Sequence, residues 1–303
     1  MADNQLRIGI PKGSLQESTL SLFARAGFAF YGSERSLWLT SSDIDIKPVL
    51  LRPQEIPGYV ADGSLDCGLA GWDWICEAIE DGVQEDSLQM LADLCYSKRS
   101  FRPIRWVLAV KKDGPYHSLQ DLQRVGDSEK RIATELQNIT ERWLANKGII
   151  AKVAFSWGAT EAKVGAFADA IVEATETGSS LEANGLKILD TVFTSTTRFF
   201  ANREAYRRKG WKRTKLDAIS LLLKSCLQAE VKDTVRIVAG PRELPILEAL
   251  IPSDASYTVS HSLDGSGIID VVIQKSDARE LIPRLARNGA FRITTSPVGM
   301  LYK

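Results

Sequence analysis

Short apolar runs alternate with amphipathic segments through the first third of the chain. LRIGI, IKPVLL and DCGLAG are typical of buried strands, and SLQESTLSLFARAGF and WDWICEAIED carry apolar residues at helical spacing. Strands separated by helices indicate parallel pairing, because a parallel pair needs a long crossover connection instead of a tight turn. The sequence therefore predicts an α/β fold.

A second α/β segment follows the basic stretch SKRSFRPIRWVLAVKK. It holds KRIATE, the helix ITERWLANKG ending at Gly148, the strand AKVAFSW and the run ADAIVEATETGSSLEANG, and the later segment near TKLDAISLLLKSCLQAEV is expected to return to the first part. We predict lobe I at residues 1–100 and 187–228 and lobe II at residues 101–186. Two such lobes form a cleft, which is a favoured place for a ligand.

The pattern changes near the C-terminus. VRIVAG, ELPILEALI, ASYTVSHSL, GIIDVVIQ, SDARELIPRLARNG and FRITTSPVGM follow one another as strand, helix, strand, strand, helix and strand. This βαββαβ order is the ferredoxin-like one. We predict a separate domain at residues 229–303.

Composition excludes several classes of function. The 38 basic residues are balanced by 38 acidic ones, which is unlike a dedicated nucleic-acid binder. The four cysteines lack CxxC spacing, which argues against zinc. The N-terminus carries no export signal, and no apolar run approaches the ~18 residues that a membrane helix needs, so we expect a cytoplasmic protein without a membrane partner.

Only two histidines occur, and neither lies beside a serine or cysteine nucleophile in the sequence. Catalysis by this chain would therefore use carboxylates, cations, hydroxyls and backbone amides.

The stretch ADAIVEA places acids inside a predicted strand. Asp169 and Glu173 would share one face about 13 Å apart, too far to chelate one ion together. Glu173 lies nearer the C-terminal end of the strand, where open α/β sheets bind ligands, so it is the better candidate for contact with substrate hydroxyls or a magnesium-bound group. Asp169 can equally be a structural carboxylate held by neighbouring amides.

The TETGSSL loop that follows supplies hydroxyls and a glycine before a predicted helix. These groups can form a phosphate cradle without a lysine, although a merely capped helix has the same pattern. No Walker A sequence occurs. Gly13 and Ser14 pose a similar choice after the first strand, between an anion contact and a tight turn with a serine N-cap.

The run GATEAKVGAFADAIVEATETGSSLEANGL resembles the phosphoribosyl-pyrophosphate motif of the ATP phosphoribosyltransferases, the family that opens histidine biosynthesis. The likeness covers the whole chain through IGIPKGSL, LRPQEIPGYVADGSLDCGLAGWDWICE, RIATELQNITERWLANKG and the C-terminal unit. Length and third domain resemble the long form of the family. This resemblance implies a two-lobe core like that of periplasmic binding proteins and a regulatory, histidine-binding domain at residues 229–303.

The resemblance also implies site residues at the matching positions. The implied catalytic residues are Glu173, Asp169 and Arg52. Phosphoribosyl pyrophosphate would contact Glu161, Thr175, Glu176, Thr177, Gly178, Ser179, Ser180 and Leu181. The nucleotide would contact Lys12, Gly13, Ser14, Asp73, Arg105 and Thr134. Feedback regulation would involve Tyr257, Thr258 and His261.

The implied reaction is pentosyl transfer from phosphoribosyl pyrophosphate to N1 of ATP, giving phosphoribosyl-ATP and pyrophosphate under inhibition by L-histidine. Mg²⁺ is the implied cofactor, bound mainly through substrate phosphates without a fixed protein site. The implied assembly is a homo-oligomer, from dimer to hexamer. Two alternatives remain: a non-catalytic two-lobe binding or sensor protein, and a phosphoribosyltransferase for another base.

Three segments depart from the family pattern. Ser14 stands where many members have arginine, and TEAKVG lacks the proline frequent after the family's glutamate. In the third domain SYTVSHSL replaces the usual PTVSPL, so Tyr257 and His261 stand in place of prolines.

Overall fold

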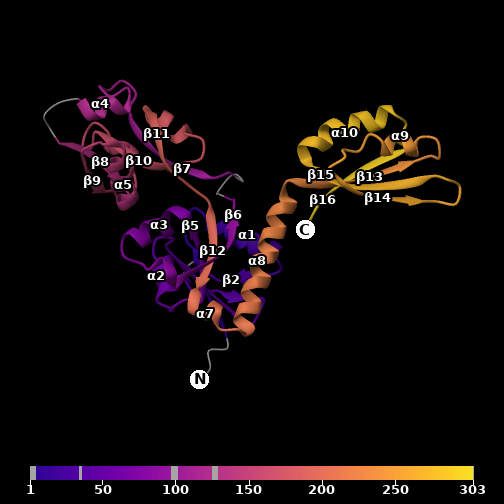
Figure 1. Ribbon diagram of the computed structural model, residues 1–303, viewed down its shortest axis with the longest axis horizontal. Helices are drawn as coiled ribbons and strands as arrows, with labels where there is room; N and C mark the ends of the chain where they lie inside the picture. Colours follow the sequence, from indigo (N-terminus) through magenta and orange to yellow (C-terminus); the bar gives the residue numbers. More distant parts are fainter. Residues whose placement is uncertain (1–4, 34–35, 97–101, 125–128, 303) are drawn as a thin grey trace. The chain divides into compact units, whose positions relative to one another are not determined.

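The computed structural model describes residues 5–33, 36–96, 102–124 and 129–302 of the 303-residue chain. Two compact units make up this part of the chain. One contains the residues up to 24 together with 28–220, and the other contains 25–27 together with 221–303. Many of their elements are labelled in Figure 1.

The first unit contains two five-stranded sheets, each the centre of one lobe. In lobe I the strand order is β4-β1-β5-β12-β6, with β1 parallel to β4 and β5 and with β12 antiparallel to β5 and β6. These strands are β1 (Leu6–Pro11), β4 (Ile46–Leu51), β5 (Cys67–Gly71), β6 (Leu88–Leu94) and β12 (Thr197–Asn202). The other elements of this lobe are α1 (Gln16–Arg25), β2 (Phe30–Tyr31), β3 (Thr40–Ser41), α2 (Ile56–Ala61), α3 (Trp72–Glu80), the 3-10 turn η1 (Glu85–Ser87), α7 (Arg203–Arg207) and the start of α8 (Trp211–Glu230).

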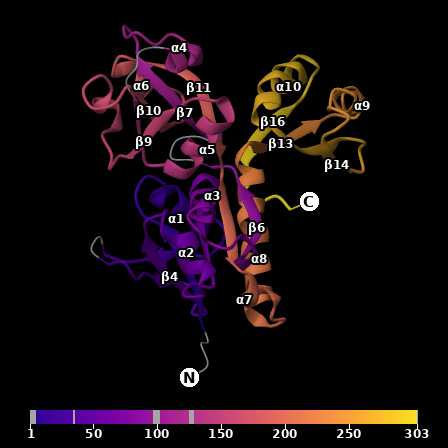
Figure 2. The same ribbon diagram turned by 60° about the vertical axis from the view of Figure 1, so that its left-hand side comes forward.

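Every residue of β5 is buried, as expected for a strand covered on both faces. Helices α2 and α3, both labelled in Figure 2, pack against it. Ile56, Val60 and Ile75 of these helices join a buried cluster with Ala70 of β5. Burial of about 25 cal/mol per Å² of apolar surface in such clusters is the main stabilising term of the lobe.

Lobe II has the strand order β11-β7-β10-β8-β9. Here β10 is parallel to β8 and antiparallel to β7, and β8 is parallel to β9. The strands are β7 (Ile104–Lys111), β8 (Lys130–Thr134), β9 (Ala151–Phe155), β10 (Ala170–Thr175) and β11 (Leu186–Ser195). The helical elements are α4 (Leu119–Arg124), α5 (Gln137–Lys147), the 3-10 turn η2 (Thr160–Lys163) and α6 (Ser179–Ala183).

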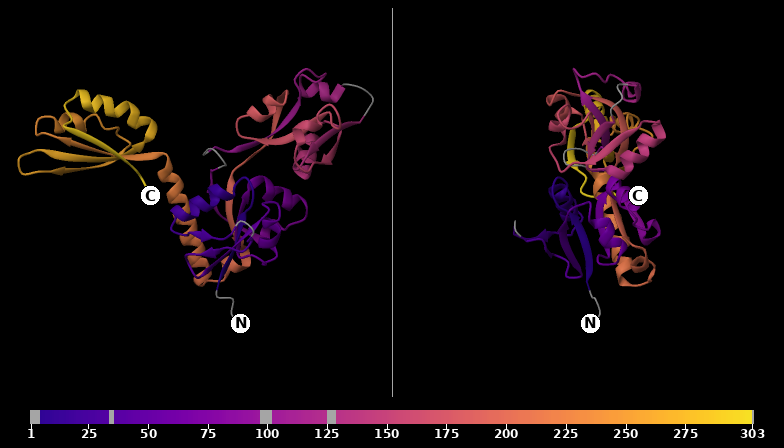
Figure 3. Two further views of the ribbon diagram at one scale, coloured as in Figure 1. Left: turned by 180° about the vertical axis from the view of Figure 1, so that it is seen from behind. Right: turned by 90° about the vertical axis from the view of Figure 1, so that its left-hand side faces the viewer.

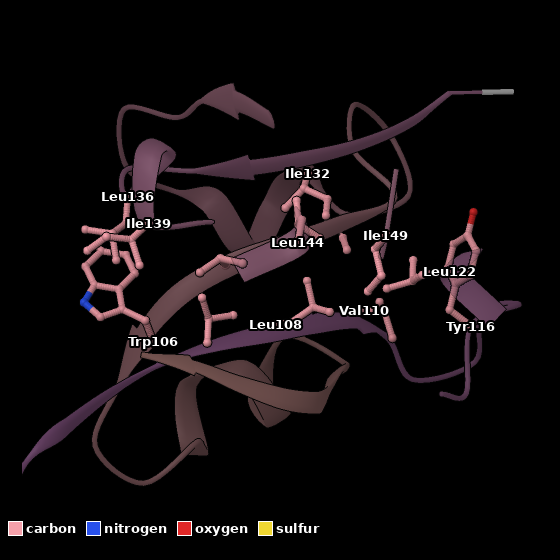
Figure 4. Close-up of a cluster of buried hydrophobic side chains, with 13 residues drawn as sticks. Trp106, Leu108, Val110, Tyr116, Leu122, Ile132, Leu136, Ile139, Leu144 and Ile149 are labelled. Carbon is pink, nitrogen blue, oxygen red and sulfur yellow. The ribbon is translucent and has the colours of Figure 1, made fainter. Parts of the chain in front are cut away.

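One of the hydrophobic clusters of lobe II lies between β7 and α5 (Figure 4). Trp106 and Leu108 from alternate positions of β7 meet Ile139 and Leu144 of α5 in this cluster. The helix ends at Gly148 in the left-handed conformation (φ 67°), which glycine adopts without strain, as the sequence predicted.

The first turn of α5 is capped from the other lobe. Leu136, at its N-cap, makes no side-chain capping bond. Instead the two carboxylate oxygens of Glu77 on α3 accept hydrogen bonds from the backbone N–H groups of Asn138 (2.7 Å) and Ile139 (3.0 Å). A negative charge at a helix N-terminus is stabilising, so this carboxylate holds the two lobes together.

The return from lobe II to lobe I occurs later than the sequence analysis placed it. β11 pairs along its length with β7, so residues 187–195 belong to the sheet of lobe II, and the chain enters lobe I at β12. The C-terminal unit likewise begins at residue 221 instead of 229. Within that unit the backbone of Ser225 on α8 accepts a hydrogen bond from the N–H of Leu301 (3.1 Å).

The C-terminal unit contains β13 (Lys232–Ala239), α9 (Leu244–Glu248), β14 (Ser256–His261), β15 (Gly267–Gln274), α10 (Lys275–Arg287) and β16 (Arg292–Pro297). The strands form an antiparallel sheet in the order β14-β15-β13-β16. Alternate residues of β15 are buried, and their partners in the core include Leu247 of α9 and Leu281 of α10, so both helices cover the same face (Figure 3). The predicted α/β class, two-lobe core and βαββαβ order are confirmed.

No helix in the described ranges is long and apolar enough to cross a membrane.

Candidate active site

A cleft of about 1360 Å³ is lined by residues of both sheets of the first unit. Lys12 and Arg52 follow the C-terminal ends of β1 and β4, and Asp73 lies in the first turn of α3 directly after β5. Lobe II contributes Glu173 and the loop after β10. The cleft therefore lies at the carboxyl ends of parallel strands, where open α/β sheets bind ligands.

Two basic residues occupy neighbouring backbone positions in lobe I. The backbone N–H of Lys12 donates to the carbonyl of Leu51 (2.7 Å), which continues the parallel pairing of β1 with β4 and brings Lys12 next to Arg52. Gly13 then turns the chain with φ +100°, a value that glycine tolerates best. This edge of the cleft suits a polyanionic ligand.

The loop after β10 is organised by its own hydroxyl groups. The N–H of Gly178 donates to Oγ1 of Thr175 (2.8 Å), and the hydroxyls of Thr177 and Ser179 lie 3.0 Å apart. Gly178 has φ +87°. Thr177, Ser179 and Ser180 are exposed and line the cleft, so their hydroxyls are available to phosphate oxygens.

Glu173 is a carboxyl of the cleft with a strongly raised pKa. Burial raises its pKa from 4.5 to about 7, against the opposing effect of a hydrogen bond from Thr160, and the nearby charges of Glu161 and Glu135 raise it further. Glu161 in turn accepts a hydrogen bond from the hydroxyl of Ser180 (3.1 Å). A carboxyl that titrates near neutrality inside a cleft is typical of a functional group.

Asp73 anchors the crossing between the lobes. Its carboxylate accepts hydrogen bonds from Trp106 Nε1 (2.5 Å), Ser195 Oγ (2.9 Å) and the N–H of Trp74 (3.0 Å), and burial raises its pKa. Trp106 lies near the start of β7 and Ser195 ends β11, the two strands by which the chain enters and leaves lobe II. A Cβ on residue 71 would lie 2.0 Å from the Asp73 carboxylate, so only glycine at this position leaves room for the Asp73 side chain.

The structure brings ten of the predicted site residues to the cleft lining. These are Lys12, Ser14, Arg52, Asp73, Glu173, Thr175, Glu176, Thr177, Ser179 and Ser180. Seven other predicted residues, all within the described part of the chain, are not in the lining: Gly13, Arg105, Thr134, Glu161, Asp169, Gly178 and Leu181. Two of these, Gly13 and Gly178, form turns within segments that line the cleft, and Glu161 accepts a hydrogen bond from the lining residue Ser180.

Asp169 has a structural position. It directly precedes β10, at the opposite end of the strand from the hydroxyl-rich loop of residues 175–180. Its carboxylate accepts hydrogen bonds from the Tyr116 hydroxyl (2.9 Å) and from the backbone N–H of Arg131 (2.9 Å). The geometry therefore favours the structural interpretation of Asp169 over a catalytic one. Thr134 is fully buried and accepts from the N–H of Leu136, and Leu181 lies in the core.

Arg105 lies opposite Thr175 in the register of β7 with β10. Directly paired residues share a sheet face, so Arg105 is on the Glu173 side of the sheet although it is outside the cleft lining.

The predicted regulatory residues lie on β14, the edge strand of the C-terminal sheet. The Tyr257 hydroxyl donates to Glu248 (3.2 Å). Tyr257 and His261 share the face of the partly buried Val259, and Thr258 is on the opposite face. The strand thus does not bring all three side chains together within this unit.

Sequence analysis missed several residues of the cleft: Trp106, Glu135, Phe155, Trp157 and Ser195. Phe155 and Trp157 had a usable signal, because aromatic residues directly after a strand at the ligand-binding edge of a sheet are suited to contact a ligand. Trp106 and Ser195 had none, since their partner Asp73 is distant in sequence.

No group of three or more His, Cys, Asp or Glu side chains arranged for a metal ion occurs within the described residues.

Comparison with known proteins gives consistent results. A sequence model of the family described as ATP phosphoribosyltransferase matches residues 52–225. An ATP phosphoribosyltransferase of Thermodesulfovibrio yellowstonii is 44% identical over 299 residues, which cover 98% of either protein. One from Chlorobium phaeobacteroides is 44% identical over 95% of this chain and 94% of its own length. Among solved structures, a chain of the "ATP phosphoribosyl transferase (HisG:HisZ) complex from Thermotoga maritima" has a TM-score of 0.58 and 29% identity, over 73% of this chain and 99% of that one.

Proposed function

Because this chain belongs to the ATP phosphoribosyltransferase family, we propose that it transfers the phosphoribosyl group of phosphoribosyl pyrophosphate to N1 of ATP in the cleft described above. The enzyme class, a pentosyltransferase of the first step of histidine biosynthesis, follows from the family. The observation that carries the proposed chemistry is the pairing of Glu173 and the hydroxyl loop of lobe II with Lys12 and Arg52 of lobe I in one cleft.

The bond changes of the transfer suit these groups. N1 of adenine attacks the anomeric carbon with its lone pair as the bond from that carbon to the diphosphate oxygen breaks, so no base has to remove a proton. Positive charge develops on the ribose, and the ionised carboxylate of Glu173 would stabilise it and orient the ribose hydroxyls. Thr177, Ser179 and Ser180 would hold the 5′-phosphate, and Lys12 and Arg52 would balance the charge of the polyphosphates.

Magnesium fits this donor set. Carboxylate oxygens such as those of Glu135 and Glu173 in the lining are the ligand type that Mg²⁺ prefers, and the ion is usually held mostly through substrate phosphates and water. When bound, it would neutralise charge on the leaving diphosphate. We propose that it arrives with the substrates.

The C-terminal domain supports a regulatory proposal. The Thermodesulfovibrio relative matches this chain over 98% of either length and so shares this domain. We propose that L-histidine binds the C-terminal domains of a homo-oligomer and lowers transfer by favouring a less active assembly.

The test is to mix purified protein with ATP, phosphoribosyl pyrophosphate and Mg²⁺, follow phosphoribosyl-ATP by absorbance, and repeat with millimolar histidine or with other nucleobases in place of ATP. Product with ATP alone, suppressed by histidine, is expected. Transfer to another base would contradict the assigned acceptor. Ligand binding without any product would favour a non-catalytic binding protein, and product that histidine does not reduce would refute the regulatory proposal.

A further inference from the structure

Two aromatic side chains at the end of β9 lie exposed in the cleft. Trp157 is 77% exposed and Phe155 is 44% exposed, and both line the cavity. Their ring centroids are 4.6 Å apart in an edge-to-face arrangement, so Phe155 supports the indole from one side. An exposed indole supported in this way leaves a flat apolar surface open to a ligand.

The loop that carries Trp157 is held rigidly. Ser156 is fully buried, its N–H donates to the carbonyl of Thr134 (2.9 Å), and its hydroxyl lies 2.9 Å from Oγ1 of Thr160. Gly158 and Ala159 then adopt positive φ values of 62° and 46°. A left-handed alanine costs about 1–2 kcal/mol, and such conformations persist where the surrounding structure imposes them.

The same loop is joined to the proposed phosphoribosyl site. Thr160 donates a side-chain hydrogen bond to Glu173. Trp157 precedes Thr160 by three residues, so their Cα atoms are at most about 11 Å apart. The loop that carries the indole is therefore bonded directly to the carboxylate expected to face the reacting ribose.

A cation from the opposite lobe lies over the ring. The guanidinium carbon of Arg52 is 5.9 Å from the centroid of the Trp157 ring, and Lys12 is next to Arg52 at the edge of lobe I. A ligand that uses both features needs a flat aromatic part and an attached polyanion. ATP has both, whereas phosphoribosyl pyrophosphate has no aromatic part.

We propose that Trp157, supported by Phe155, is the surface on which the purine ring of ATP stacks, with the triphosphate directed toward Arg52 and Lys12. This inference takes the acceptor from the proposed function. It makes Trp157 a determinant of acceptor binding, distinct from the residues that hold the phosphoribosyl donor.

The test is calorimetric titration of ATP, inorganic tripolyphosphate and phosphoribosyl pyrophosphate into the wild type and into the variants Trp157→Ala, Trp157→Phe and Phe167→Ala. Phe167 is the matched control, because it is 76% exposed in the same lobe but outside the cleft lining. Trp157→Ala should lower the affinity for ATP about 5- to 150-fold, the range expected for loss of one base–aromatic stack. Trp157→Phe should recover much of the loss, and Phe167→Ala should bind ATP as the wild type does.

Tripolyphosphate and phosphoribosyl pyrophosphate should bind Trp157→Ala as tightly as they bind the wild type. An unchanged ATP affinity in Trp157→Ala, or an equal loss for tripolyphosphate or the donor, would overturn the inference. If the wild type forms no phosphoribosyl-ATP while Trp157→Ala still loses ATP selectively, the proposed function fails and the stacking surface stands.

Discussion

Replacing Glu173 with glutamine should make the protein more stable above pH 7 while it removes activity. The pKa of Glu173 rises from 4.5 to about 7 on folding, chiefly because the carboxyl is buried. Between pH 4.5 and about pH 7 the folded state therefore binds more protons than the unfolded state, and the free energy of unfolding falls as pH rises through this range. At about 1.4 kcal/mol for each pH unit, the loss from this one group approaches 3 kcal/mol by pH 8.

Glutamine has the shape of the neutral acid and does not ionise. Glu173→Gln should therefore exceed the wild type by less than about 1 kcal/mol at pH 5, where only the unfolded chain has begun to ionise, and by up to about 3 kcal/mol at pH 8. The same change should lower turnover at least about 100-fold, because the ionised carboxylate is lost from the reacting ribose. For the same reason kcat/KM of the wild type should rise between pH 6 and pH 8.

Urea unfolding at pH 5 and pH 8, followed by tryptophan fluorescence, measures the stability difference. All seven tryptophans lie in the unit of residues up to 24 with 28–220, so the signal follows the unit that holds Glu173. Glu182→Gln, an exposed change on α6, is the matched control and should keep the pH dependence of the wild type. A Glu173→Gln protein with the same stability difference from the wild type at both pH values would refute the reasoning.

Three further changes test other parts of the account. Ser195→Ala leaves the buried Asp73 carboxylate short of a donor and should lower the free energy of unfolding by about 1–3 kcal/mol in the same urea assay, where no change would contradict the proposed anchor. Gly178→Ala places a Cβ at a residue with φ +87°, which costs about 1–2 kcal/mol. In calorimetry this variant should bind phosphoribosyl pyrophosphate more weakly and ATP as tightly as the wild type. An equal loss of affinity for both ligands would argue against the loop's role. Leu281→Ala opens a cavity in the C-terminal core and should lower the free energy of unfolding of that domain by about 2–5 kcal/mol. Inhibition by histidine should fall while phosphoribosyl transfer is preserved. Full inhibition in a protein whose C-terminal domain is unfolded would contradict the regulatory proposal.

The strand and helix pattern of the sequence was enough to predict the α/β class, because β1 and β5 are short apolar runs that each lead into a helix and must be buried. The point at which the chain changes sheets could not be predicted in this way. LKILDTVFTSTTRFFAN carries one continuous strand pattern, and β11 and β12 are separated only at Thr196. Which sheet each half joins is decided by long-range pairing with β7 and β5.

The site was predictable where a local motif carried it. The loop from Thr175 to Ser180 has hydroxyls and a glycine in one stretch, and the structure places it in the cleft beside Glu173. The bonds of Asp73 to Trp106 and Ser195 join residues from three separate elements, and no local pattern reveals them. Asp169 shares a strand face with Glu173 by alternation, but its end of the strand faces Tyr116 and Arg131 instead of the cleft.

The most direct test of the central claim, that phosphoribosyl transfer takes place beside Glu173, is a single-turnover rapid-quench measurement with wild type and Glu173→Gln at saturating ATP, phosphoribosyl pyrophosphate and Mg²⁺. The account predicts that the wild type forms phosphoribosyl-ATP and pyrophosphate in equal amounts, and that the folded variant does so at least about 100-fold more slowly. Transfer by the variant at the rate of the wild type would contradict it.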